Sequence, residues 1–152
     1  EAFLLEVLSE YAVTIPELGT IAAERPPIVV ITSNRTRDVH DALKRRCLYH
    51  WVEHPEFERE VEIVRLKSDG ASDRVTTEVA AAVASMRSLG LYKPPGVAES
   101  IDWSKALTML GEQSLDADTI RATIGTVLKY REDQLRVMGT AFDEVLAAVG
   151  RV

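Results

Sequence analysis

The stretch that decides the fold runs from Ile28 to Cys47 and reads IVVITSNRTRDVHDALKRRC. It opens with four consecutive β-branched residues, Ile28 to Ile31. Such a run is typical of a strand covered on both faces, as in a parallel sheet. We expect this strand to end on Thr-Ser-Asn, with Asn34 at its tip, and a short helix over residues 38–46 to end in Arg45 and Arg46. The stretch therefore predicts part of an α/β layer.

The flanking residues extend this layer in both directions. Residues 1–11 carry apolar side chains on one side and predict a helix, which begins without a capping residue. Residues 13–21 predict a β-hairpin with Pro16–Gly19 at its tip. Residues 47–52 predict a second short strand. Because a parallel strand needs neighbours and the sequence supplies few, we expect this chain to be a fragment of a larger fold.

From Pro55 onward every segment has helical periodicity, so we expect an α/β part over residues 1–54 and an all-helical part over residues 55–152. Asp116 or Asp118 is the expected cap of the fourth helix there, and Gly139 is a candidate break after it. The expected inward-facing residues of the four helices are Phe57, Val61, Val64 and Leu66; Val75, Val79, Val83, Met86 and Leu89; Ile101, Trp103, Leu107 and Leu110; and Ile120, Ile124, Val127 and Leu128.

Composition excludes several classes of protein. The chain has 152 residues, of which 46% are hydrophobic, so it can form a core. Its formal net charge of -6 disfavours nucleic-acid binding, which needs a basic face. Its one cysteine, Cys47, cannot form an intrachain disulfide, and a reducing, cytoplasmic location fits best. No apolar run approaches the roughly 20 residues of a membrane span.

Asn34, Arg45 and Arg46 are the candidate functional residues. In open α/β sheets ligands lie beyond the carboxyl ends of the strands, where the Asn34 amide can bind a phosphate oxygen or orient a water. Adjacent arginines cannot both face one core, and a guanidinium suits phosphate recognition. Taken alone, each feature also fits an ordinary role, because Ser-Asn is common in turns and cations are favourable at helix C-termini.

Other groups of residues give weaker evidence for a functional site. Cys47, His50 and His54 have spacing that resembles a metal set, but residues three apart on a strand point to opposite faces, so no metal site is expected. Trp103 is expected in the core. The sequence contains no G-x-x-x-x-G-K-[ST] phosphate loop.

Taken together, the segments VTIPELGTI, PIVVITSNRTRDVHDALKRRCLYHW, PEFEREVEIV, LYKPPGVAESIDW and LKYREDQ resemble the second half of an AAA+ ATPase of the MoxR clade, in the branch that accompanies von Willebrand A-domain proteins. The resemblance implies that the P-loop NTPase core is partial, with the Walker A and Walker B regions upstream. It implies that Asn34 is the sensor-1 amide, that Arg46, or its neighbour Arg45, is the arginine finger, and that residues 13–21 are the pre-sensor-1 hairpin. Residues from about Pro55 match the helical lid.

The same resemblance implies a function. The full-length protein would hydrolyse ATP with Mg²⁺ in a homo-oligomeric ring, expected to be a hexamer, and the fragment alone would be inactive. It would remodel or mature a partner, with metal-cofactor insertion as one form of this task, together with a von Willebrand A-domain protein and without nucleic acid or membrane. One departure is that Glu99 and Ser100 occupy the register of the sensor-2 arginine, with Lys105 one turn further along, so sensor 2 is unassigned. The alternatives are a non-catalytic helical interaction module and a nucleic-acid-associated AAA+ regulator.

Overall fold

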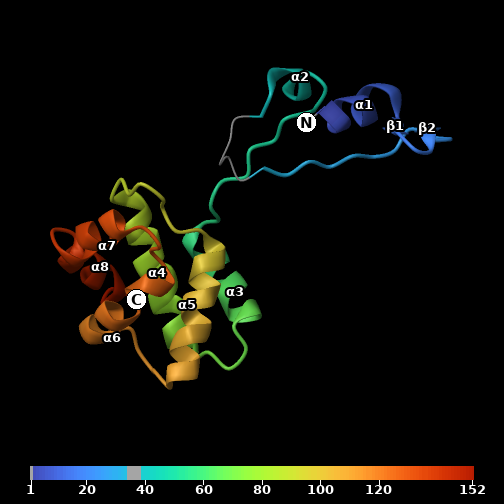
Figure 1. The fold of residues 1–152 in the computed structure, drawn as a ribbon. Helices are drawn as coiled ribbons and strands as arrows, with labels where there is room; N and C mark the ends of the chain where they lie inside the picture. Colours follow the sequence, from blue (N-terminus) through green and yellow to red (C-terminus); the bar gives the residue numbers. More distant parts are fainter. Residues whose placement is uncertain (1, 34–38) are drawn as a thin grey trace. The chain divides into compact units, whose positions relative to one another are not determined.

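The computed structural model describes residues 2–33 and 39–152 (Figure 1). These residues form eight α-helices, a short 3-10 helix and one two-stranded sheet. The chain divides into two compact units, Glu1–Val52 and Glu53–Val152. In residues 2–33 and 39–152, no helix combines the length and apolar character that a membrane crossing requires.

The first unit is built on a helix that leads directly into a hairpin. Helix α1 (Ala2–Glu10) is followed by β1 (Ala12–Ile15) and β2 (Gly19–Ala22), which pair antiparallel with Val13 opposite Ile21. Tyr11, between α1 and β1, has a φ of 52°, which is uncommon for a bulky residue and turns the chain sharply from helix to strand. Gly19 has a φ of 80° at the end of the turn, where glycine costs least. The helix and the hairpin predicted from the sequence are both confirmed.

The two other predicted strands are wrong for this structure. Residues 28–31 and 47–52 form no strand, and their large apolar side chains are exposed. The physical reason is that a strand is defined by hydrogen bonds to a neighbour, and the described residues place no partner strand beside either segment. Between them, the predicted short helix is reduced to α2 (Asp41–Lys44).

The second unit consists of helices around a central one. Helix α4 packs against α3, α5 and α8, as Figure 1 shows. Its apolar stripe was predicted well, because Val75, Val79, Val83 and Met86 are all buried. The elements of this unit are α3 (Phe57–Lys67), α4 (Asp73–Ser88), α5 (Val97–Leu110), α6 (Ala117–Thr123), the 3-10 helix η1 (Ile124–Thr126), α7 (Arg131–Met138) and α8 (Phe142–Val149).

Trp103 lies at the centre of this core, as the sequence predicted. Its side chain is fully buried, and its indole N–H donates to Thr123 Oγ1 at 2.8 Å. The Thr123 hydroxyl in turn donates to the Thr119 carbonyl at 2.6 Å. The indole N–H and the Thr123 hydroxyl are therefore both paired, which lets the large indole fill the core without an unpaired donor of its own.

Other predictions for the helical unit were wrong in detail. Leu66 and Leu110 were expected to face inward, but both are exposed at the C-terminal ends of α3 and α5, beyond the packed part of each helix. The predicted fourth helix does not continue through Leu128, because α6 ends at Thr123 and becomes the tighter turn η1, which contains the poor helix former Gly125. A break at Gly139 is confirmed, since α7 ends at Met138.

A buried ion pair joins three parts of the helical unit. The Glu60 carboxylate accepts from Arg87 Nη1 and Nη2 at 2.5 and 2.9 Å and from the Ser100 hydroxyl at 2.7 Å. Arg87 Nε also donates to the Pro95 carbonyl at 2.7 Å. The pair therefore connects α3, α4 and the start of α5. Buried charges are tolerable in a core only when they are paired and hydrogen-bonded in this way.

Candidate functional site

The structure locates two of the three candidate residues predicted from the sequence. Arg45 and Arg46 follow α2 in the first unit, and both are exposed. Asn34 lies outside the described residues, as does residue 38, the first of the helix predicted over residues 38–46. Within the described residues, the candidate site therefore consists of the end of α2 and the residues that contact it.

Local interactions hold the single turn of α2 in place. The N-cap is His40, whose Nδ1 accepts from the Ala42 N–H at 3.2 Å. Leu43 is buried and anchors the turn to the rest of the unit. Lys44 Nζ lies 3.6 Å from Asp41 Oδ1 at the surface. A helix this short depends on such caps and on its one buried side chain.

The Arg46 side chain is fixed by two hydrogen bonds. Its Nε donates to Ser9 Oγ at 2.8 Å, and its Nη1 donates to the Ala42 carbonyl at 2.9 Å. Ser9 belongs to α1 and Ala42 to α2, so the guanidinium is held between two elements of the first unit. These bonds use two of the five N–H donors of arginine, and within the part of the chain that the structure describes the other three stay free to bind an anion.

Arg45 differs from its neighbour. Its backbone N–H donates to the Asp41 carbonyl as part of the C-cap of α2. Its side chain makes no hydrogen bond or ion pair with any residue that the structure describes. Lys44, Arg45 and Arg46 together place three consecutive cations at this point of a chain whose net charge is -6. Such a cluster can attract a phosphate or a carboxylate.

Internal bonds occupy the start of α5, where the resemblance to the MoxR clade places sensor 2. Glu99 accepts from the Gly96 N–H at 2.9 Å, which caps α5. Ser100 is buried and donates to Glu60, as described above. Neither residue is a cation, and both are engaged within the helical unit. The loop before them is held by the buried Asp133 carboxylate, which accepts from the Tyr92 and Lys93 N–H groups at 2.8 and 3.1 Å.

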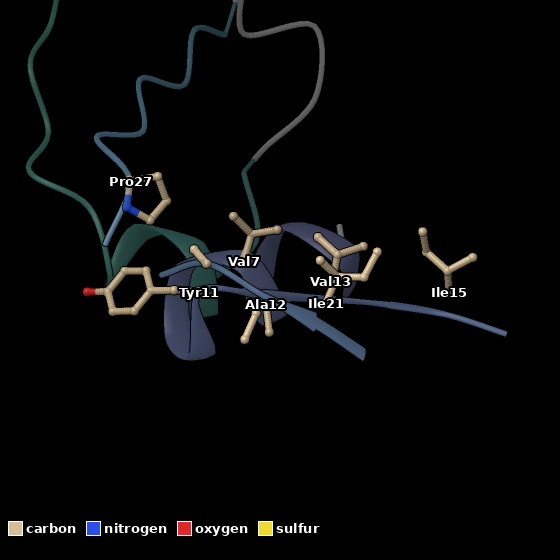
Figure 2. Close-up of a pocket in the computed structure, with 9 residues that line it drawn as sticks. Val7, Tyr11, Ala12, Val13, Ile15, Ile21 and Pro27 are labelled. Carbon is tan, nitrogen blue, oxygen red and sulfur yellow. The ribbon is translucent and has the colours of Figure 1, made fainter. Parts of the chain in front are cut away.

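An apolar hollow of about 360 Å³ lies in the first unit between α1, the hairpin and Pro27 (Figure 2). Small-molecule sites combine apolar walls with a few polar groups that orient the ligand. This hollow is walled by aliphatic side chains, and the hydroxyl of Tyr11 is the one polar side-chain group among its lining residues. It therefore lacks the features of an active site.

A metal site is not assembled by the residues that the structure describes. No three His, Cys, Asp or Glu side chains within residues 2–33 and 39–152 come together in a group that could hold a metal ion. Cys47 is half-buried with a free thiol, while His50 and His54 are both exposed.

No protein-family model, curated protein or solved structure matches this chain. The resemblance to the MoxR clade therefore stays a prediction that depends on the quoted segments. Ser9 is the residue that sequence reasoning missed. It is separated from Arg46 by 37 positions, and nothing in the pattern around it marks it as a partner of the arginine.

Proposed function

We propose that this chain is the C-terminal part of an AAA+ ATPase of the MoxR type, which hydrolyses ATP in a homo-oligomeric ring. The observation that carries the proposal is the Arg46 guanidinium, which is exposed, is oriented by two hydrogen bonds and has three donors that no described residue uses. The helix and hairpin before it and the helical unit after it support the proposal, whereas the two strands predicted at residues 28–31 and 47–52 do not form.

In this proposal the three candidate residues act on the terminal phosphate of ATP. The Asn34 amide positions the attacking water within its own subunit. Arg46, or Arg45, reaches the nucleotide of the neighbouring subunit and stabilises the charge that develops on the transferring phosphoryl group. Mg²⁺ and the phosphate cradle belong to residues outside this sequence, which has no Gly-rich phosphate loop.

A finger supplied in trans requires a neighbour, so the proposed active form is a closed ring. Head-to-tail contacts generate a ring when the rotation between subunits closes, and a hexamer is the form that we propose. The proposed task is remodelling or maturation of a partner protein in the cytoplasm, such as insertion of a metal cofactor, together with a von Willebrand A-domain protein.

The test is ATP turnover by the full-length protein. We expect Arg46→Ala to lower kcat about 10³-fold or more, the range for loss of an arginine finger, while nucleotide still binds. Because the finger acts on the neighbour, mixing Arg46→Ala subunits with Asn34→Ala subunits should give more turnover than either variant alone, since an Asn34→Ala subunit supplies the finger to a site that keeps its amide. Retained turnover in the Arg46→Ala protein would remove the finger from the proposal, and a wild-type protein without turnover would remove the ATPase.

A second candidate is a non-catalytic interaction module. It is favoured by the core cluster of the helical unit, whose buried residues all lie within residues 75–149 and so come from that unit alone. This function predicts that residues 53–152 alone bind the partner of the full-length protein, with the same affinity in the presence and absence of ATP. A requirement for nucleotide or for residues 1–52 would count against it.

A further inference from the structure

We propose that Ser9 is a positioning residue that orients the Arg46 guanidinium toward the phosphate of the neighbouring subunit, an inference that rests on the function proposed above. The bond from Arg46 Nε to Ser9 Oγ, 2.8 Å long, joins α1 to the residue that follows α2 by two positions. It is the contact that ties this arginine to an element other than its own.

The second bond has its origin in the backbone of α2. In a longer helix the Ala42 carbonyl would accept from the N–H of Arg46, four residues on. Here the Arg46 N–H donates to the Leu43 carbonyl instead, at 3.0 Å. The Ala42 carbonyl is one of the acceptors that a helix end leaves unsatisfied, and Arg46 Nη1 fills it at 2.9 Å. This bond draws the side chain back along α2, and the Ser9 bond then fixes its remaining rotation.

The two bonds leave the end of the guanidinium formed by Nη1 and Nη2 accessible to a phosphate. Among residues 2–33 and 39–152, nothing accepts from the two hydrogens of Nη2 or from one hydrogen of Nη1, because only Nε and one Nη1 hydrogen are used. The two terminal nitrogens can therefore donate side by side to two oxygens of a phosphate, which is the geometry that distinguishes arginine from lysine. A group held in this way needs little reorganisation at the moment of reaction.

The Arg45 side chain is not oriented by such bonds to described residues. No described residue holds its side chain, so its guanidinium would have to be ordered by the phosphate itself. The structure thus separates two arginines that the sequence presents as equivalent neighbours. The Arg46 guanidinium is already oriented to donate to a phosphate, and Arg45 adds positive charge beside it.

The experiment measures steady-state ATP turnover in full-length protein carrying Ser9→Ala, with Ser9→Thr as the conservative variant that keeps a hydroxyl. We expect Ser9→Ala to lower kcat roughly five- to ten-fold, the worth of one hydrogen bond, with KM for ATP and the affinity for ADP unchanged. Ser9→Thr should recover most of the loss. Ser88→Ala, which removes an exposed hydroxyl on α4, is the matched serine control and should keep wild-type turnover.

A double variant separates positioning from a general loss of stability. If Ser9 acts through Arg46, Ser9→Ala should add nothing to the loss caused by Arg46→Ala, because the group that it orients is gone. Arg45→Ala should lose at least tenfold less than Arg46→Ala. Additive losses, or a Ser9→Thr protein as slow as Ser9→Ala, would overturn the role of Ser9. Wild-type kcat in Ser9→Ala would overturn that role alone, whereas absence of turnover in the wild-type protein would overturn the proposed function and this inference together.

Discussion

At the scale of single residues, Glu60 is a charged side chain that is buried and therefore depends on its hydrogen-bond partners. Its carboxylate is 1% exposed and accepts hydrogen bonds from Arg87 and Ser100. A buried pair of charges gains little over an apolar pair of the same size, but removal of one partner leaves an uncompensated charge in the core. Stability of the helical unit should therefore depend on the pair being kept or removed together.

We expect Glu60→Ala to lower the free energy of unfolding of the helical unit by about 3 kcal/mol or more. The matched control is Arg59→Ala, which breaks the exposed Arg59–Glu62 pair, 2.8 Å apart, and should cost no more than about 0.5 kcal/mol. Urea denaturation followed by circular dichroism at 222 nm measures both. A loss for Glu60→Ala no larger than that of the control would show that the buried pair is not needed.

At the scale of secondary structure, two helices of the second unit, α4 and α6, begin on a side chain that accepts from one of their first N–H groups. Ser72 Oγ accepts from Val75 N–H at the start of α4, and Asp116 Oδ1 accepts from Thr119 N–H at the start of α6. Asp116, rather than Asp118, is thus the cap that the sequence left open. The Thr119 backbone N–H, followed by the Thr119 hydroxyl, lowers the pKa of the Asp116 carboxyl.

This direction fixes how stability depends on pH. A carboxyl whose pKa is lower in the folded state stabilises the fold at a pH above its unfolded pKa, near 4, and loses that contribution as pH falls through the folded pKa. We expect Asp116→Ala to lower the thermal midpoint at pH 7, and the difference from wild type to shrink below about pH 4. Asp116→Asn keeps an acceptor that does not titrate, so its midpoint at pH 7 should stay close to wild type. A difference between Asp116→Ala and wild type that is constant from pH 7 to pH 2.5 would contradict the assignment.

Helices were predictable here because their signal is local. The residues Val75, Val79, Val83 and Met86 repeat along α4 at helical spacing, and this pattern depends on no distant partner. The run Ile28–Ile31 has an equally clear pattern, but a strand exists only where a second segment supplies hydrogen bonds, and the described residues supply none there. The hairpin formed as predicted because its two strands are neighbours in the sequence.

At the scale of the whole molecule, the two units differ in how much apolar surface they bury. In the described part of residues 1–52, Ala12 and Leu43 are the buried hydrophobic residues, whereas the large side chains of residues 28–31 are exposed. The core of residues 53–152 includes Trp103, Met86 and Leu107, all fully buried. Since burial of apolar surface is the main force that offsets chain entropy, the units should differ in independent stability.

We expect residues 53–152, expressed alone, to unfold in one cooperative transition, and residues 1–52 alone to show none. The reason is that the core cluster lies within residues 75–149 and needs nothing from the first unit. Scanning calorimetry of the two segments measures the transitions. The 152-residue chain is the control, and its main transition should match that of residues 53–152. A non-cooperative melt of residues 53–152 would show that its core depends on other residues.

The candidate site shows the same division between local and distant signals. Arg45 and Arg46 could be chosen from the sequence because adjacent cations after a predicted strand and helix form a recognisable pattern. The pattern could not distinguish them, because what separates them is the contact of Arg46 with Ser9, 37 residues earlier. Such a contact depends on how α1 and α2 pack, and periodicity carries no information about it.

The two tryptophans lie in different surroundings, one in each unit. Trp103 is sealed in the core of the helical unit with its N–H bonded to Thr123, whereas Trp51 belongs to the first unit and is exposed. Indole fluorescence shifts to the red when the ring meets water, so the blue part of the emission comes from Trp103 alone. The protein thus contains its own optical probe of the helical unit, and replacing Trp51 with phenylalanine would leave that probe free of background.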